Sequence, residues 1–195
     1  MYEVIGNRNS RTTRVLWMLE EIGAEYRLTE VPPQAPEVRS LNPSGKIPVM
    51  VADGTALTDS TAILHYLADS NEALTFPAGT VDRARQDAAT FFLLDEFDAL
   101  LWFSARHSFA LPEVRRVPAV KDSLRWEYGR SLERLAGRLG DGPYLMGDTM
   151  TVADIIAGHC LSWAVVARFP RGEGAVADYL ERLRARPAFR RAMAQ

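Results

Sequence analysis

Leu41-Asn-Pro-Ser-Gly-Lys-Ile-Pro-Val-Met-Val51 and Leu57-Thr-Asp-Ser-Thr-Ala-Ile63 are the two stretches that decide the fold. The first predicts a turn and then a strand that is entered through the Ile47-Pro48 bond. Asp53-Gly54 favours a hairpin turn into the next strand, and Asp59-Ser60 is typical of the start of a helix. Free strand backbone can pair with an extended peptide, and a helix N-terminus attracts a carboxylate. The segment therefore suits a small peptide that carries a free carboxylate.

Composition and charge narrow the class of protein. The 195 residues carry a formal net charge of -2, and no run of basic residues alternates with aromatic ones, so we expect no nucleic-acid partner. Cys160 is the single cysteine, which excludes an intrachain disulfide and is typical of a cytoplasmic protein. The first residues lack the regions of a signal peptide, and no apolar run is long enough to cross a bilayer. We therefore expect a cytoplasmic protein with no membrane partner.

The first part of the chain predicts a mixed α/β domain over residues 1–72. Strand patterns at 2–5, 26–30, 48–51 and 56–58 alternate with helical spacing at about 15–22 and 61–69. The prolines at 32, 33 and 36 predict an irregular connection. The order β-α-β and then β-β-α predicts a four-stranded mixed sheet with helices packed against it.

The second part predicts an all-helical domain over residues 82–195, after a linker at 73–81. Helices are expected at 82–107, 120–139, 151–169 and 176–184, with a short last helix opened by Pro187. The first of these is apolar nearly all round in its second half, which predicts that it is mostly buried. Thr151 and Asp154 predict a capping box, with Asp in place of the usual Glu, to which we assign a structural role only.

With Gly147-Asp-Thr-Met-Thr-Val-Ala-Asp154 added, the motifs resemble the cytosolic glutathione transferase family in order and spacing over the whole chain. The resemblance is to a bacterial-type member with a serine- or asparagine-type active site. It implies an α/β plus all-α architecture, in which a thioredoxin-like N-terminal domain is followed by an all-helical domain. It also implies glutathione as co-substrate, transfer to a small hydrophobic electrophile, a role in detoxification, and a homodimer.

The resemblance assigns glutathione contacts to five residues. The backbone of Ile47 would pair with the cysteinyl part of glutathione, and its bond to Pro48 would be cis. Ser60 would hold the γ-glutamyl carboxylate, Asp59 the glutamyl ammonium, and Lys46 a carboxylate. The structural alternative is plain N-capping by Asp59 and Ser60. Both can hold together, because a cap leaves amides directed at the ligand.

The group that activates the thiol is Ser10 or Asn9. A free thiol has a pKa of about 8.5, and one hydrogen bond to the thiolate contributes roughly 1.5–3 kcal/mol, which lowers that pKa by about one to two units. A donor at the N-terminus of the first helix is therefore sufficient. Asn9 falls on the family's usual serine position and Ser10 on the next one. We prefer Ser10 because a hydroxyl is the commoner donor, although either residue could act only as a helix cap.

The acceptor pocket is expected between the domains, at the end of the helix that follows the linker. The resemblance places Trp102, Phe103, Arg106 and His107 there, although aromatics at helical spacing are more often core residues. No two of the three histidines have the spacing of metal ligands, so no metal is predicted. Cys160 is predicted to be an inert core thiol.

Two classes of function remain open from the sequence. The first is an enzyme that stabilises the glutathione thiolate and transfers it to an electrophile, or uses it in isomerisation or peroxide reduction. The second is a non-catalytic binding or interaction protein on the same fold, because fold does not fix function. A thioredoxin-type redox protein is not supported, since the first-helix loop has no Cys-x-x-Cys.

Overall fold

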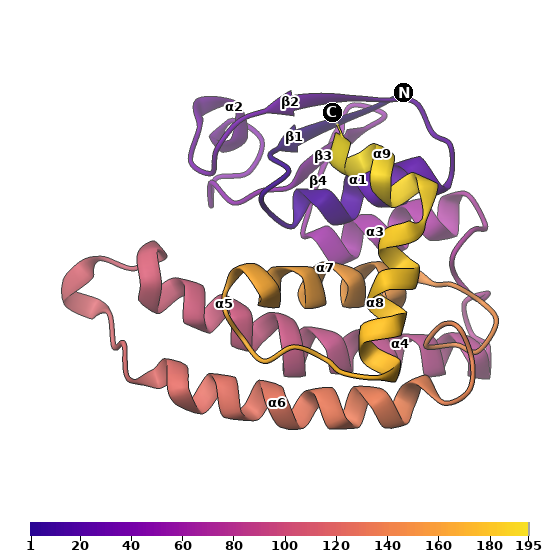
Figure 1. Ribbon diagram of the computed structural model, residues 1–195. Coiled ribbons are helices and arrows are strands. Elements are labelled where there is room, and N and C mark those ends of the chain that lie inside the picture. Colours follow the sequence, from indigo (N-terminus) through magenta and orange to yellow (C-terminus); the bar gives the residue numbers. More distant parts are fainter. Residues whose placement is uncertain (195) are drawn as a thin grey trace. The chain divides into compact units, whose positions relative to one another are not determined.

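The computed structural model describes residues 1–194, and its first part forms a four-stranded mixed sheet (Figure 1). The strands β1 (Tyr2–Gly6), β2 (Tyr26–Glu30), β3 (Val49–Ala52) and β4 (Thr55–Thr58) lie in the order β2-β1-β3-β4. β1 is parallel to β2 and antiparallel to β3, and β3 pairs antiparallel with β4. The four predicted strands are confirmed, with small shifts at their ends.

Three helices follow the strands of this unit in sequence: α1 (Thr12–Glu21), α2 (Pro36–Arg39) and α3 (Ser60–Ser70). α1 is buried from Thr12 to Leu19, as the periodicity of its apolar residues predicted. α2 lies where the sequence predicted only an irregular connection. It begins at Pro36, since proline has a fixed φ suited to the first helical turn and lacks only an amide that would be unbonded there.

The last helix, α9 (Pro187–Ala194), packs on α1, beside which it lies in Figure 1. The rings of Trp17 and Phe189 meet edge to face at 4.9 Å, and Arg186 forms a two-point ion pair with Glu21 at 2.6 and 2.7 Å. The contacts therefore group the chain from Arg184 onward with Met1–Pro77. The sequence-based bounds 1–72, 73–81 and 82–195 do not anticipate this return of the chain, and they stay predictions.

The helical unit, Ala78–Leu183, begins with a long helix that contains two π-helical turns. α4 (Val81–Leu93) continues through a π-helical turn, η1 (Leu94–Asp98), into α5 (Ala99–Ala105) and a second π-helical turn, η2 (Arg106–Ala110). Hydrophobic spacing predicted one uniform helix over 82–107 and did not predict these wider turns. The prediction that its apolar second half is mostly buried is wrong at Phe103, which is 45% exposed.

The rest of this unit consists of a short 3₁₀ turn, η3 (Glu113–Arg115), and three helices, α6 (Val120–Leu139), α7 (Val152–Val166) and α8 (Ala175–Ala185). Three buried aromatic rings form a column within the unit. Phe97, Tyr128 and Phe169 stack edge to face in series at 5.0 and 5.3 Å. Among the described residues, no helix combines the length and the apolar character that a membrane span requires.

The predicted capping box at the start of α7 is confirmed and extends further than the sequence suggested. Asp154 is fully buried, and its carboxylate accepts from the Thr151 amide at 2.7 Å. It also accepts from the Leu145 amide at 3.0 Å and from the Tyr179 hydroxyl at 2.6 Å. Burial raises the pKa of the Asp154 carboxyl, and these hydrogen bonds oppose that rise. One side chain therefore joins the start of α7 to α8 and to the preceding loop.

Candidate functional site

The turn before β3 is held by its own polar side chains. The Asn42 side chain donates to the Lys46 carbonyl at 2.9 Å and accepts from the Ser44 amide at 3.2 Å and hydroxyl at 2.8 Å. Gly45 has a φ of 68°, a conformation that an L side chain rarely adopts. This explains why the stretch from Asn42 to Lys46 contains polar residues and a glycine at this spacing, and it fixes the approach of the chain to Ile47.

Ile47 precedes β3, and its bond to Pro48 is cis, as the resemblance implied. β3 is an interior strand, paired with β1 and β4 from Val49 onward. The free strand edge predicted from sequence is therefore limited to the residue before β3. Over residues 1–194, the Ile47 amide and carbonyl form no backbone hydrogen bond. They are available to a bound peptide.

The register of the sheet brings the start of α3 to the same place. Val49 pairs with Thr58, so Ile47 and Ser60 lie two residues beyond that pair at one end of the β3–β4 hairpin. A Cβ added to Gly6 would lie 3.3 Å from the Cβ of Ile47 and 2.2 Å from Thr12 Oγ1. The end of β1 and the start of α1 therefore meet Ile47 as well. Three chain segments therefore converge around Ile47.

Asp59 acts as the N-cap of α3. Its Oδ1 accepts from the Thr61 amide at 2.8 Å and the Ala62 amide at 3.1 Å, with the backbone at a φ of 69°. The capping alternative is therefore correct in part. Asp59 is exposed, and no bond of its second carboxylate oxygen is described within residues 1–194. That oxygen can still face a cation.

Ser60 is almost fully buried, and it contacts a charge that sequence reasoning missed. Its hydroxyl lies 3.4 Å from Nη1 of Arg14, which has no exposed surface. A buried guanidinium beside the first residue of α3 makes this helix end more attractive to a carboxylate than the helix dipole alone. The available signal was a single arginine directly before the apolar run that starts at Val15.

Ser10 and Asn9 differ in what their side chains already bind. The Ser10 hydroxyl donates to the Asn7 carbonyl at 2.7 Å and accepts from the Thr12 amide at 3.1 Å, so it forms a turn that leads into α1. Asn9 is exposed, and no hydrogen bond of its side-chain amide is described in residues 1–194. The Ser10 hydroxyl is therefore already hydrogen-bonded within the turn, whereas the side-chain amide of Asn9 can donate to a bound ligand.

Comparison with known proteins shows to which family this chain belongs. Residues 10–70 match the model of the glutathione S-transferase N-terminal domain, and residues 119–194 match that of the C-terminal domain. The chain belongs to the glutathione S-transferase family. A solved theta-class glutathione S-transferase from Xanthomonas axonopodis pv. citri, with glutathione bound, has a TM-score of 0.81 and is 27% identical, covering 100% of this chain and 97% of that one.

Two curated relatives are similar to this chain over most of its length. The glutathione S-transferase-like protein TpcF of Aspergillus fumigatus is 28% identical, covering 98% of this chain and 94% of its own length. The disulfide-bond oxidoreductase YfcG of Escherichia coli is 29% identical, covering 90% and 86%. The relatives therefore agree on the family and carry different reaction names.

The other residues that the glutathione S-transferase resemblance assigned lie at the surface of the two units. Lys46 is exposed beside Ile47. Trp102 is half-buried and Phe103 exposed, and the guanidinium of Arg106 lies 5.3 Å from the Phe103 ring centre. His107 Nδ1 accepts from the Val117 amide at 3.1 Å, which closes the loop after η2. These four pocket residues form a continuous end of one helix, and their role stays a prediction.

Proposed function

We propose that this protein binds glutathione as its thiolate and transfers it to a small hydrophobic electrophile. The observation that carries the proposal is the convergence of the Ile47 backbone, the capped start of α3, and the end of β1 and start of α1, which flank the loop with Asn9 and Ser10. A tripeptide with a γ-glutamyl carboxylate matches these groups in order. The glutathione-bound Xanthomonas relative supports glutathione as the co-substrate.

The thiolate donor in this proposal is Asn9, with Ser10 as the residue that shapes the turn. The side-chain amide of Asn9 can donate one hydrogen bond to the sulfur, and a bond to a charged acceptor contributes about 1.5–3 kcal/mol. That corresponds to a fall of about one to two units in the glutathione thiol pKa. The proton leaves to solvent. The thiolate sulfur then attacks the electrophilic carbon, and the leaving group departs with its bonding electrons.

A second candidate is thiol–disulfide exchange by the bound glutathione, which the relationship to the oxidoreductase YfcG favours. The loop before α1 offers no cysteine, so the reacting sulfur would be that of glutathione itself. The thiolate would attack a disulfide sulfur and release the other sulfur as a thiolate. The same Asn9 hydrogen bond would serve both reactions.

The test is calorimetric titration of glutathione, followed by turnover of bound glutathione with 1-chloro-2,4-dinitrobenzene and with a small disulfide. Asp59→Asn keeps a good N-cap and removes the charge, so we expect glutathione binding to weaken by about tenfold, equivalent to roughly 1.4 kcal/mol. Asp53→Asn, a second exposed acid at positive φ, is the matched control and should bind normally.

Four outcomes separate the interpretations of this experiment. Binding with conjugation supports the transferase proposal, and binding with disulfide reduction alone supports the second candidate. Binding without either reaction supports the non-catalytic alternative. If the wild-type protein does not bind glutathione, both enzymatic proposals fail.

A further inference from the structure

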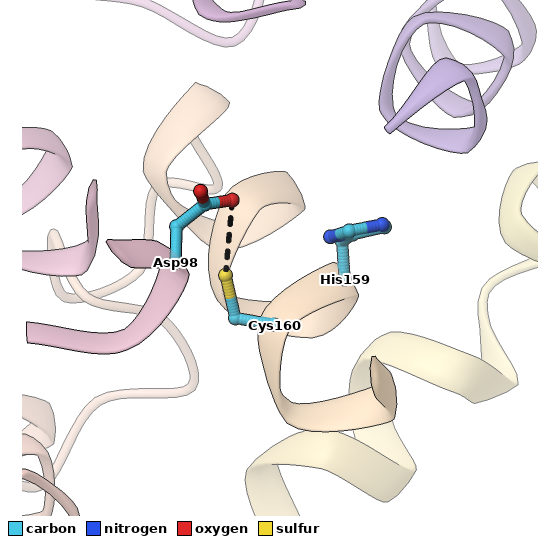
Figure 2. A group of neighbouring side chains, drawn as sticks. All are labelled: Asp98, His159 and Cys160. Carbon is cyan, nitrogen blue, oxygen red and sulfur yellow. Dashed lines mark hydrogen bonds between the residues drawn. The ribbon is translucent and has the colours of Figure 1, made fainter. Parts of the chain in front are cut away.

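Asp98, His159 and Cys160 bring three different metal-binding groups together inside the helical unit (Figure 2). Asp98 is the last residue of η1, and His159 and Cys160 are consecutive residues of α7. One donor atom from each side chain lies within 4.8 Å of the other two, and Cys160 Sγ is 4.0 Å from Asp98 Oδ2. Asp98 is 8% exposed and Cys160 has no exposed surface. This cluster is independent of the proposed glutathione site.

A fourth polar side chain lies near this cluster: the Tyr128 ring is 5.0 Å from the ring of Phe97, the residue before Asp98. The Tyr128 hydroxyl is fully buried, and it has no hydrogen-bond partner among the described residues. Buried hydroxyls in native proteins are nearly always bonded to protein, water or an ion. An ion or its bound water at Cys160 would give the Tyr128 hydroxyl the partner it lacks.

The local winding of the helix places Asp98 in the cluster. η1 runs from Leu94 to Asp98 as a π-helical turn, which inserts an extra residue and turns the following side chains relative to a regular α-helix. Such turns are rare and occur frequently at functional sites. Hydrophobic spacing along the chain gives no warning of this turn. Such spacing relates residues of a single helix, so it cannot indicate that a metal-binding side chain of another helix lies close to them.

The geometry points to a site for a borderline-soft divalent cation, with Zn²⁺ as the best match, held by Asp98, His159 and Cys160. Thiolate, imidazole and carboxylate are the three side-chain donors that zinc uses. At bond lengths of about 2.0–2.3 Å, donors lie roughly 3–4 Å apart, so the three groups need to close by about 1 Å. On binding, the Cys160 thiol loses its proton to solvent as the metal–sulfur bond forms. The fourth position would take water, hydrogen-bonded to Tyr128.

Cobalt substitution tests this site directly, because the chain has one cysteine. The chelator-treated 195-residue protein is titrated with Co²⁺, and the near-ultraviolet sulfur-to-cobalt charge-transfer band is recorded. Cys160 is the only thiolate that can produce this band. We expect one Co²⁺ per chain, displaced stoichiometrically by Zn²⁺, and a rise in the melting temperature when Zn²⁺ is bound. Absence of the band in folded wild-type protein overturns the proposal.

Variants then separate the built site from chance binding at the surface. Cys160→Ser should abolish the band, and Asp98→Asn and His159→Gln should each weaken Co²⁺ binding by at least tenfold. Tyr128→Phe should weaken it by about tenfold, as loss of a group beyond the ligands does. His65→Gln, on α3 in the other unit, is the matched control and should bind like the wild type. Zn²⁺ binding that survives Cys160→Ser and Asp98→Asn unchanged contradicts the assignment.

Discussion

Replacing Asp154 with alanine should lower the unfolding free energy more than the same replacement at any other acidic residue of the helical unit. The substitution removes the acceptor of the Thr151 amide, the Leu145 amide and the Tyr179 hydroxyl. Loss of a helix cap alone costs about 0.5–2 kcal/mol. Each hydrogen bond to a charged group contributes about 1.5–3 kcal/mol, and such contributions are not additive within one network.

The expected loss of unfolding free energy for Asp154→Ala is therefore about 3–5 kcal/mol, the range typical of a broken buried network. The assay is equilibrium urea denaturation followed by circular dichroism, with the change taken from the midpoint and slope. Asp148→Ala removes an exposed acid from the preceding loop and should stay within about 0.5 kcal/mol of the wild type. A loss below about 1 kcal/mol for Asp154→Ala would refute the reasoning, because the buried donors would then have found other partners at little cost.

Three further predictions concern the contact of the last helix with α1, the pH dependence of stability and the formation of a homodimer. Arg186→Ala should lower the unfolding free energy by about 2–4 kcal/mol in the same assay. The reason is that Glu21, whose side chain is 8% exposed, loses its charged partner and keeps the hydrogen bond from the Trp17 indole. Arg190→Ala, at an exposed position, is the control, and equal losses for the two variants would contradict the claim. Burial raises the pKa of Glu96. Hydrogen bonds from Ser131 and Arg134 and the charges of nearby arginines lower that pKa by more, so its net shift is downward. At pH values above the ordinary glutamate pKa this carboxylate should therefore stabilise the fold, and the stabilisation should be lost as the pH falls through the lowered pKa of the folded state. In Glu96→Gln the melting temperature should fall less steeply at acid pH than in the wild type. An unchanged acid dependence would contradict the role of Glu96. The homodimer predicted by resemblance should appear at micromolar concentration in light scattering coupled to size exclusion, and monomer alone would remove that prediction.

Local signals predicted most of the fold. The turn at Asp53-Gly54, the cap at Asp59 and the box at Thr151 and Asp154 each depend on residues close in sequence, and each is present. The cis bond at Ile47 could be expected only through the family resemblance, since proline alone leaves the isomer open.

The features that the sequence did not predict depend on contacts between distant residues. The pairing of Trp17 with Phe189 places the last helix on α1, and no local pattern encodes that partner. The contact of Arg14 with Ser60 has the same origin. The hydrogen bond from the Ser10 hydroxyl to the Asn7 carbonyl could also be seen only in three dimensions. The preference for Ser10 over Asn9 as the thiol-activating group stays a prediction.

The most direct test of the central claim is the ultraviolet absorbance of the glutathione thiolate on the protein, measured across pH for the wild type, Asn9→Ala and Ser10→Ala. The account predicts that the bound thiol has a pKa about one to two units below the free value of about 8.5 in the wild type. Asn9→Ala should return it close to that value with little loss of affinity, and Ser10→Ala should change it less. A bound thiol that ionises no more readily than free glutathione, or that depends on Ser10 and not on Asn9, would contradict the account.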